Sequence, residues 1–489
     1  MLKKFLLLFI TLIILSSCAG HDNPNPNEKD TKTENSENIE TTPEKFTPNL
    51  PERDFGGYKF RALVPEDNIY GTFKFSADEE TGDTVNDAIY KRNIYVEDKY
   101  NVVFKETATS DYHEPTGLFE KSVLAGSDDF DLCAQVNAIY QITKGYVLPA
   151  DKLPYLDLDQ PWYFQDYTRT NSVGNKIFTV FSDECASVYD AIQPLYFNKK
   201  LIADYNMESP YELVNGGAWT YDKFFGMSRE ASFDVDGDGK MTDVDNYGIL
   251  AVRDGFLIDF WVCAGVQTVI KDSDDLLILN LTGNEKLFSI LENVRRNLYG
   301  ADKIWFAPGL DEVTDFDAND VYGVSRRQFE NNQGLFLSER VRSLPLLRAM
   351  DADFGIIPFP KANEAQSRYY VHTNGGWPKV VPIHAPDPER TSIIMEAVAA
   401  ESRNTTVPAL KEVALKTKFA RDNESADMLD LIFDNVFVDW GMAFWKEVRN
   451  PIYEETAGNG NYASMIERKS AGMTKALNDL NDAIVDKYN

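Results

Sequence analysis

The apolar and polar positions along the chain predict strands and helices that alternate. Residues 58–64 form an apolar run of strand length, and residues 84–100 place apolar side chains at the spacing of one helix face, with Asp83 or Thr84 as N-cap. This order is typical of an α/β fold with a doubly wound parallel sheet. Further strands are expected at 101–107, 130–135, 176–181, 195–197, 247–250, 354–357 and 369–371, and further helices at 118–124, 220–230, 256–263, 284–298 and 388–401.

The C-terminal stretch repeats apolar residues at helical spacing. The positions that fall on one face of such a helix are Ile466, Met473, Leu477, Leu480 and Ile484. The sequence therefore predicts an amphipathic C-terminal helix with one buried side.

The N-terminus has the pattern of a secretory signal peptide. Lys3 and Lys4 precede an apolar core at 5–15, which is shorter than the roughly 20 residues that a membrane-spanning helix needs. The core ends in the letters LSSC at 15–18, which are similar to a bacterial lipobox. We therefore expect residues 1–17 to be removed and Cys18 to carry lipid on its sulfur. An ordinary signal peptide with a chance cysteine is the alternative.

The segment that follows has almost nothing to bury. Residues 18–55 are rich in Asn, Glu, Thr, Lys and Pro, which predicts a disordered tether behind the lipidated cysteine. Beyond it, Cys133, Cys185 and Cys263 are an odd number of cysteines in apolar surroundings. This pattern excludes a disulfide framework and predicts buried free thiols.

Composition restricts the class of partner. The chain has 489 residues, enough for two domains or one large one, and 43% of them are hydrophobic, which is ample for a packed core. Against 78 acidic residues stand 49 basic ones, for a formal net charge of −29. Because such a body repels phosphate backbones and anionic lipid headgroups, nucleic acid is not expected as a partner, and membrane contact is expected only through the lipid.

One motif indicates a metal ion by its spacing. Residues 234–245 read DVDGDGKMTDVD, with glycine at the sixth position, where a calcium loop turns sharply. Position 12 is an Asp instead of the usual Glu, which predicts weaker binding than in a calcium sensor. An acidic turn without an ion is the alternative. The expected Ca²⁺ ligands of this structural site are Asp234, Asp236, Asp238, Lys240 through its carbonyl, Thr242 and Asp245.

Catalytic motifs are not apparent. The four histidines are scattered without metal-ligand spacing, and no nucleophile elbow, phosphate-binding loop or dinucleotide fingerprint occurs. A glycosidase needs two carboxyl groups that face one bond, but among 78 acidic residues chance pairs are common. We therefore do not expect an enzyme.

Several tryptophans lie beside polar residues and turns. Sugar rings present an apolar C–H face with hydroxyls at the edge, so a binder needs flat aromatic platforms next to polar groups. A single Trp is more often part of the core. The paired glycines before Trp377 allow a close backbone approach. The candidates from this reading are Trp162, Asn374, Trp377, Trp440 and Trp445.

Several segments, in the order in which they occur, resemble the extracellular solute-binding proteins (family 1) of sugar-importing ABC transporters, a family that is similar to maltose-binding proteins. The lipobox, the polar tether and the calcium-type loop resemble those of its Gram-positive lipoproteins. The other matching segments are AGSDDFDL at 125–132, LYFNKKL at 195–201, residues 215–225, DNYG at 245–248 and FGIIPFP at 354–360. Together they cover nearly the whole chain after the signal peptide.

The resemblance implies a type II periplasmic-binding-protein-like fold, in which two α/β lobes joined by a hinge hold a ligand in the cleft between them. Lobe 1 would comprise residues 56–190 and 358–405, and lobe 2 would comprise residues 191–357 and 406–489. Matching segments imply that the ligand-binding residues include Asn137, Tyr189, Asp190, Glu339, Arg340, Trp440 and Trp445.

The resemblance also implies a function. The chain would be a lipid-anchored protein on the extracellular face of the cell membrane, where it captures a carbohydrate, such as an oligosaccharide, and delivers it to an ABC transporter permease. Two alternatives remain at this point. The ligand is a peptide or another polar solute, or the protein is a lipid-anchored surface glycosidase, for which two carboxyl groups would have to lie about 5–10 Å apart.

Overall fold

The computed structural model describes residues 45–66, 74–135, 138–298, 304–306, 323–373, 376–415, 423–457 and 461–488. These residues belong to one compact unit that begins at Lys45. The predicted signal peptide, Cys18 and most of the predicted tether lie outside the described residues. None of the described helices is both long enough and apolar enough to span a lipid bilayer.

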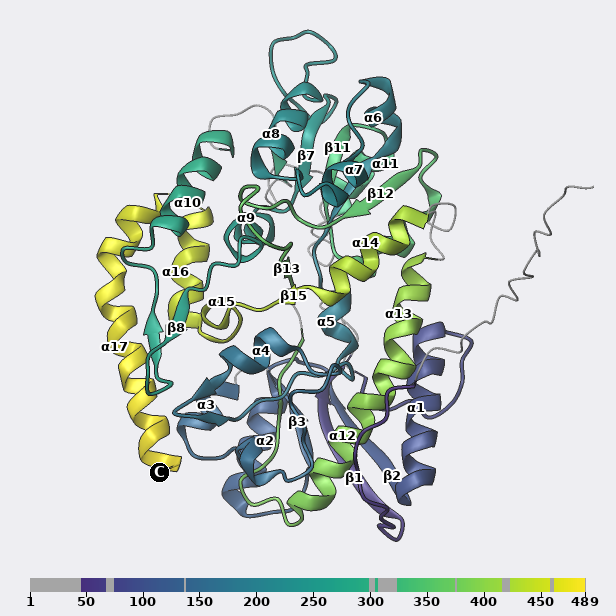
Figure 1. Ribbon diagram of the computed structural model, residues 1–489, viewed down its shortest axis with the longest axis vertical. Helices are drawn as coiled ribbons and strands as arrows, with labels where there is room; N and C mark the ends of the chain where they lie inside the picture. Colours follow the sequence, from purple (N-terminus) through teal and green to yellow (C-terminus); the bar gives the residue numbers. More distant parts are fainter. Residues whose placement is uncertain are drawn as a thin grey trace, which may run out of the picture. The chain divides into compact units, whose positions relative to one another are not determined.

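The first sheet has four strands in the order β14-β3-β1-β2 (Figure 1). Strand β1 (Tyr58–Pro65) pairs in parallel with β2 (Val102–Thr109) and with β3 (Leu132–Ala134). Strand β14 (Lys379–Val380) joins β3 in the antiparallel sense. The C-terminal half of β1 and all of β3 are buried, as expected of strands with helices on both faces.

Three helices of this sheet follow the predicted pattern. Helix α1 (Thr84–Tyr100) has the predicted bounds, and Asp83 caps it by accepting a hydrogen bond from the backbone N–H of Asn86 at 2.8 Å. Helix α2 (Glu114–Ala125) begins before the predicted 118–124. Helix α12 (Pro388–Asn404) packs on α1 and is buried along most of its length.

The second sheet has five strands in the order β10-β7-β11-β6-β12. Strands β10 (Ile304–Phe306), β7 (Tyr247–Ala251) and β11 (Gly334–Ser338) run parallel. Strands β6 (Leu195–Asn198) and β12 (Phe354–Ile357) are antiparallel to their neighbours. The expected α/β class is therefore confirmed, but both sheets are mixed. The direction of a strand depends on the edge from which the chain enters the sheet, which local sequence does not encode.

The chain passes between the two sheets three times. The first passage contains α5 (Ala186–Asp190) and leads to β6, and the second runs from β12 through β13 (Val371–His372) to β14. The third follows α12 through α13 (Thr406–Leu415) to α14 (Asn423–Asp434), which packs on β12. We call the four-stranded sheet with its helices the first lobe and the five-stranded sheet with its helices the second lobe.

The strands divide as the resemblance implied. All strands of the first sheet come from residues 56–190 and 358–405, and all strands of the second come from 191–357. Helix α13, which the sequence assigned to lobe 2, packs on α1 as well as on α12. The lobe boundaries themselves stay a prediction.

The remaining elements complete the two lobes. The C-terminal helix α17 (Tyr462–Tyr488) confirms the amphipathic prediction, because the five apolar positions named for it are all buried. The three cysteines of the described residues are buried and free, as expected. The other helices are α3 (Ala138–Thr143), α4 (Gln165–Thr170), α6 (Lys199–Asp204), α7 (Pro210–Asn215), α8 (Tyr221–Glu230), α9 (Arg253–Val262), α10 (Glu285–Leu298), α11 (Gly323–Glu330), α15 (Trp440–Phe444), α16 (Lys446–Ala457) and the short 3₁₀ helices η1 (Ala150–Lys152) and η2 (Val341–Ala349). The small hairpins are β4 (Ser172–Val173) with β5 (Lys176–Ile177) and β8 (Val269–Lys271) with β9 (Leu277–Leu279), and β13 pairs with β15 (Val436–Phe437).

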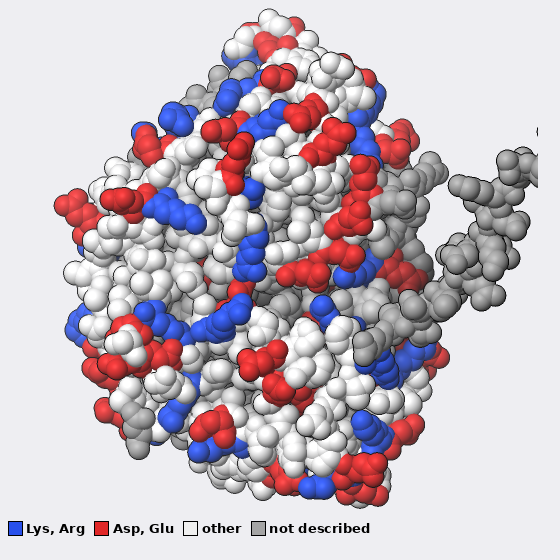
Figure 2. All heavy atoms as spheres, in the orientation of Figure 1, with Lys and Arg blue, Asp and Glu red and all other residues white. Residues whose placement is uncertain are grey.

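The charged surface agrees with the partner classes expected from composition. On the face shown in Figure 2, basic side chains lie interspersed with acidic ones and do not form one extended basic area. A protein that binds nucleic acid along its surface needs such an area to neutralise phosphates.

Candidate functional site

A pocket of about 180 Å³ lies where helices of both lobes meet. Helix α1 belongs to the first lobe, η2 follows β11 of the second, and α5 belongs to the first passage between them. The pocket is therefore at the junction of the lobes. Its lining residues are Asp83, Val85, Tyr189, Asp190, Val341, Arg342, Leu344, Pro345, Leu410, Val413 and Phe433.

The strands position this pocket. Asp83 ends the connection that leaves the carboxyl end of β1, and η2 begins two residues after the carboxyl end of β11. Ligands of open α/β sheets bind outside the carboxyl ends of the strands. The pocket occupies that edge of both sheets at once.

Two aromatic rings from different segments form one wall. The ring centroids of Tyr189 and Phe433 lie 4.8 Å apart at an interplanar angle of 42°. The Tyr189 hydroxyl donates to Asp183 Oδ1 at 2.5 Å, and Arg403 approaches Asp183 Oδ2 at 3.5 Å. Burial raises the pKa of Asp183 to about 6, although the positive charge of Arg403 opposes this rise. The tyrosine is therefore held from behind by a buried carboxyl group.

Arg403 also links the two lobes behind this wall. Its guanidinium lies 3.7 Å from Asp434 Oδ1 at the end of α14, while the arginine itself is in the last turn of α12. The side chain of Asp434 is half exposed, so the charge pair contributes at most about 1 kcal/mol.

A second aromatic pair lies at the carboxyl edge of the first sheet. The rings of Tyr112 and Trp377 are nearly parallel, with centroids 6.0 Å apart and an interplanar angle of 9°. Tyr112 follows β2, and Trp377 precedes β14, so both come from connections at this edge. Both side chains are half-buried, which leaves part of each ring open to solvent.

The close backbone approach expected at the paired glycines occurs at Gly376. A Cβ atom at this position would lie 2.4 Å from Val188 Cγ2 of α5, and its φ of +88° suits glycine. The approach is to a helix of the first passage, and it places the following Trp377 beside the junction of the lobes.

The structure brings some predicted ligand-binding residues together and separates others. Tyr189 and Asp190 line the pocket. Asn137 and Asn374 lie outside the described residues. Arg340 is half-buried next to η2 and does not line the pocket.

Four other predicted residues are buried in the core and do not line the pocket. Trp162, Trp440 and Trp445 are at most 5% exposed. Trp440 and Trp445 pack against each other with centroids 5.7 Å apart. Glu339 is fully buried and accepts a hydrogen bond from Arg326 at 2.9 Å. In this structure their described contacts are those of core residues.

The reading of the sequence missed several lining residues. Asp83 was recognised only as a helix cap, although caps at strand ends lie at the ligand-binding edge. Arg342 is two residues beyond the predicted Arg340, a shift that segment matching does not resolve. Phe433 and Tyr112 carry no local signal, because each reaches the site through packing of distant segments.

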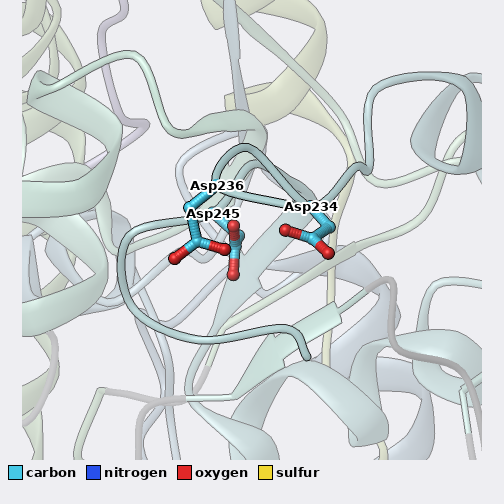
Figure 3. A group of neighbouring side chains, drawn as sticks. All are labelled: Asp234, Asp236 and Asp245. Atoms are coloured by element: carbon cyan, nitrogen blue, oxygen red, sulfur yellow. The ribbon is translucent and has the colours of Figure 1, made fainter. Parts of the chain in front are cut away.

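The aspartate loop forms a separate cluster (Figure 3). Carboxylate oxygens of Asp234, Asp236 and Asp245 lie within 4.8 Å of one another, so the three side chains can coordinate one cation. Asp238 is not part of this group. Backbone N–H groups of Gly237 and Gly239 donate to Asp234, and the hydrogen bond from Gly239 contributes most to lowering the pKa of Asp234. Strand β7 follows the loop directly, as predicted.

Comparisons with known proteins support the fold. No family model and no curated relative matches this chain. A cyclo/maltodextrin-binding protein complexed with maltotetraose shares 14% identity over 88% of this chain and 97% of its own, with a TM-score of 0.53. An ABC substrate-binding protein from Listeria monocytogenes in complex with cycloalternan shares 12% identity over 88% and 98%, with a TM-score of 0.50.

A third structure has the same architecture. A solute-binding protein from Streptococcus pneumoniae in complex with the blood group A-trisaccharide shares 14% identity over 85% of this chain and 100% of its own, with a TM-score of 0.50. These likenesses establish the fold of this chain, which is that of the type II periplasmic binding proteins. The neighbours are substrate-binding proteins and not enzymes.

Proposed function

We propose that this chain is an extracellular solute-binding protein of the family that resembles maltose-binding proteins. It captures a carbohydrate, an oligosaccharide in particular, and delivers it to the permease of an ABC transporter. The observation that carries the proposal is the pocket at the junction of two lobes in a fold shared with sugar-bound binding proteins.

The chemistry of the pocket supports this choice of ligand. Carbohydrates need hydrogen-bonding groups for their hydroxyls and flat or apolar surfaces for their C–H faces. Asp83, Asp190 and Arg342 supply the first kind, and the pair Tyr189 and Phe433 supplies the second. At about 180 Å³ the pocket is smaller than most ligand sites, which suits one sugar ring with the rest of the chain outside.

Catalysis is not part of the proposal. Asp83 and Asp190 both line the pocket, and two carboxyl groups are what a glycosidase requires. Asp83, however, is engaged as the N-cap of α1. A glycosidase would lose hydrolysis of its substrate in Asp190→Asn, whereas a binding protein leaves every sugar intact.

A thermal-shift panel tests the function. The sugars are those bound by the fold neighbours, namely maltotetraose, cycloalternan, β-1,6-galactobiose and the blood group A-trisaccharide. A ligand at 100 times its Kd stabilises the protein by about 2.7 kcal/mol. A shift with at least one sugar, and none with a library of short peptides, supports the proposal. Shifts with peptides alone identify the other solute class and overturn it.

The proposal includes a lipid anchor at Cys18, with residues 1–17 removed and the tether leading to the body that begins at Lys45. Cys18 is expected to be acylated, which places the protein on the extracellular face of the cell membrane. Expression with a labelled fatty acid tests this. The wild type is expected to carry label in the membrane fraction, and Cys18→Ala is expected to carry none.

The proposal also includes a structural Ca²⁺ in the aspartate loop. Asp234, Asp236 and Asp245 would supply carboxylates, and Lys240 and Thr242 would add oxygen ligands as the loop spacing suggests. The ion would neutralise three neighbouring carboxylates and stabilise the connection from α8 to β7. It has no role in the capture of sugar.

A further inference from the structure

The three passages between the lobes meet at strand β13. His372 of β13 pairs with Phe437 of β15, which belongs to the third passage. Its carbonyl accepts the N–H of Gln193 from the first passage at 3.4 Å, and the neighbouring Thr373 bridges to Ile192. Any opening or closing of the lobes must therefore strain the backbone around His372.

The side chain of His372 is fixed to the second lobe by one contact. Its Nδ1 lies 2.6 Å from Asp259 Oδ1 of α9, and both side chains are buried. Asp259 is fully buried, and its other oxygen, Oδ2, has no hydrogen-bond partner. Within the described part of the chain, His372 is the one ion-pair partner printed for Asp259 in this geometry.

The other titratable groups around the pair carry no positive charge. Cys263 at the end of α9 and Asp439, which caps α15 after β15, face the same site. Asp439 accepts hydrogen bonds from the N–H and hydroxyl of Thr268 at 2.9 and 2.5 Å. The pair thus lies among acidic and neutral groups in the interior of the hinge.

We propose that His372 and Asp259 form a pH-responsive pin of the hinge, which holds β13 on α9 more firmly under mildly acidic conditions than above neutrality. Because the pin concerns closure of the lobes, its biological use rests on the proposed function as a binding protein. The geometry of the pin does not depend on which ligand is bound.

The sign follows from the burial of Asp259. Burial raises its pKa to about 6, against the opposing effect of His372, whereas a solvated Asp has a pKa near 3.8. The packed hinge therefore binds a proton more tightly than an opened hinge that admits water. Acidification favours packing, and a rise in pH through about 6 leaves a buried carboxylate with an unsatisfied oxygen. Burial raises the pKa of Asp439 to about 6 as well, in the same direction.

Amide hydrogen exchange of the protein without ligand tests the pin. In the wild type we expect the protection of residues 371–373, corrected for intrinsic exchange, to be about tenfold higher near pH 5 than near pH 7.5. Asp259→Asn, which removes the titration, is expected to make this protection independent of pH. A peptide from β1 serves as the internal reference for global loosening.

Asp183→Asn is the matched control, since Asp183 is a buried carboxyl of the first passage with a similarly raised pKa but is bonded to Tyr189. It should keep the pH response of 371–373. Equal flattening in both variants, or protection in the wild type that does not change with pH, overturns the pin. If Asp259→Asn does not fold, His372→Gln must abolish the response instead. A sugar panel without any shift would sink the proposed function and leave this outcome untouched.

Discussion

The indole Nε1 of Trp162 donates a hydrogen bond to Glu396 Oε1 at 3.2 Å, which joins the long connection after η1 to the middle of α12. The other carboxylate oxygen accepts the hydroxyl of Tyr163 and the backbone N–H of Asp157. Glu396 is buried, and no described basic residue forms an ion pair with it. Trp162 thus anchors a connection of the first lobe through a carboxyl group without a counter-ion.

This environment predicts a pH-dependent stability. Burial raises the pKa of Glu396 to about 7, from an ordinary value of 4.5, although its three hydrogen bonds oppose the rise. A raised carboxyl pKa means that folding loses stability as pH increases from 4.5 to 7. One pH unit corresponds to about 1.4 kcal/mol, so the loss reaches about 3 kcal/mol. In Glu396→Gln, denaturant unfolding should lack this part of the pH dependence.

Glu389→Gln is the matched control for that measurement. Glu389 lies at the start of the same helix and pairs with Arg53 at the surface. Its substitution should leave the slope of stability against pH as in the wild type. The interpretation of Glu396 fails if both variants give the same slope.

Arg342 is expected to contact the ligand. It lines the pocket, and hydrogen bonds to charged groups contribute about 1.5–3 kcal/mol, or roughly 10- to 150-fold in affinity. Arg342→Ala should therefore raise the Kd for the active panel sugar within this range, as measured by calorimetry. Arg340→Ala tests the residue that the sequence favoured. A larger loss in Arg340→Ala would contradict the assignment of the site.

Tyr112 is expected to act through its ring. Its near-parallel arrangement with Trp377 at the edge of the first sheet forms an aromatic surface beside the junction of the lobes. Stacking on a sugar should make Tyr112→Ala bind the active panel sugar about 5- to 10-fold more weakly, since aromatic contacts contribute about 0.5–1.5 kcal/mol. Tyr112→Phe retains the ring and should bind as the wild type does. Equal losses in both variants would assign the effect to the hydroxyl.

Calcium removal tests the aspartate loop. If the loop binds Ca²⁺, saturating calcium should raise Tm, and EDTA should reverse the rise, because the ion stabilises the folded state alone. Asp236→Asn removes one of the three clustered carboxylates and should abolish this response. Asp243→Asn changes an exposed Asp of the same loop outside the cluster and should preserve it. An unchanged Tm of the wild type in EDTA argues against the site.

The sequence alone determined the local elements of this protein. The bounds of α1 and β12 and the buried face of α17 follow from apolar spacing and capping, which act over a few residues. The aspartate loop is equally local, because its ligands lie within one turn of chain. The order of the matching segments also indicated the fold that the comparisons establish.

Only the tertiary structure decided which residues share a site. Tyr189 and Phe433 meet across more than two hundred residues, as do Trp162 and Glu396, and His372 meets Asp259 across more than one hundred. Whether a tryptophan faces a ligand or the core depends on which helix packs over it. Likewise, strand direction depends on the path of the chain between sheets. These choices are settled by long-range packing, in which contacts between distant segments compete, and a local pattern carries no record of that competition.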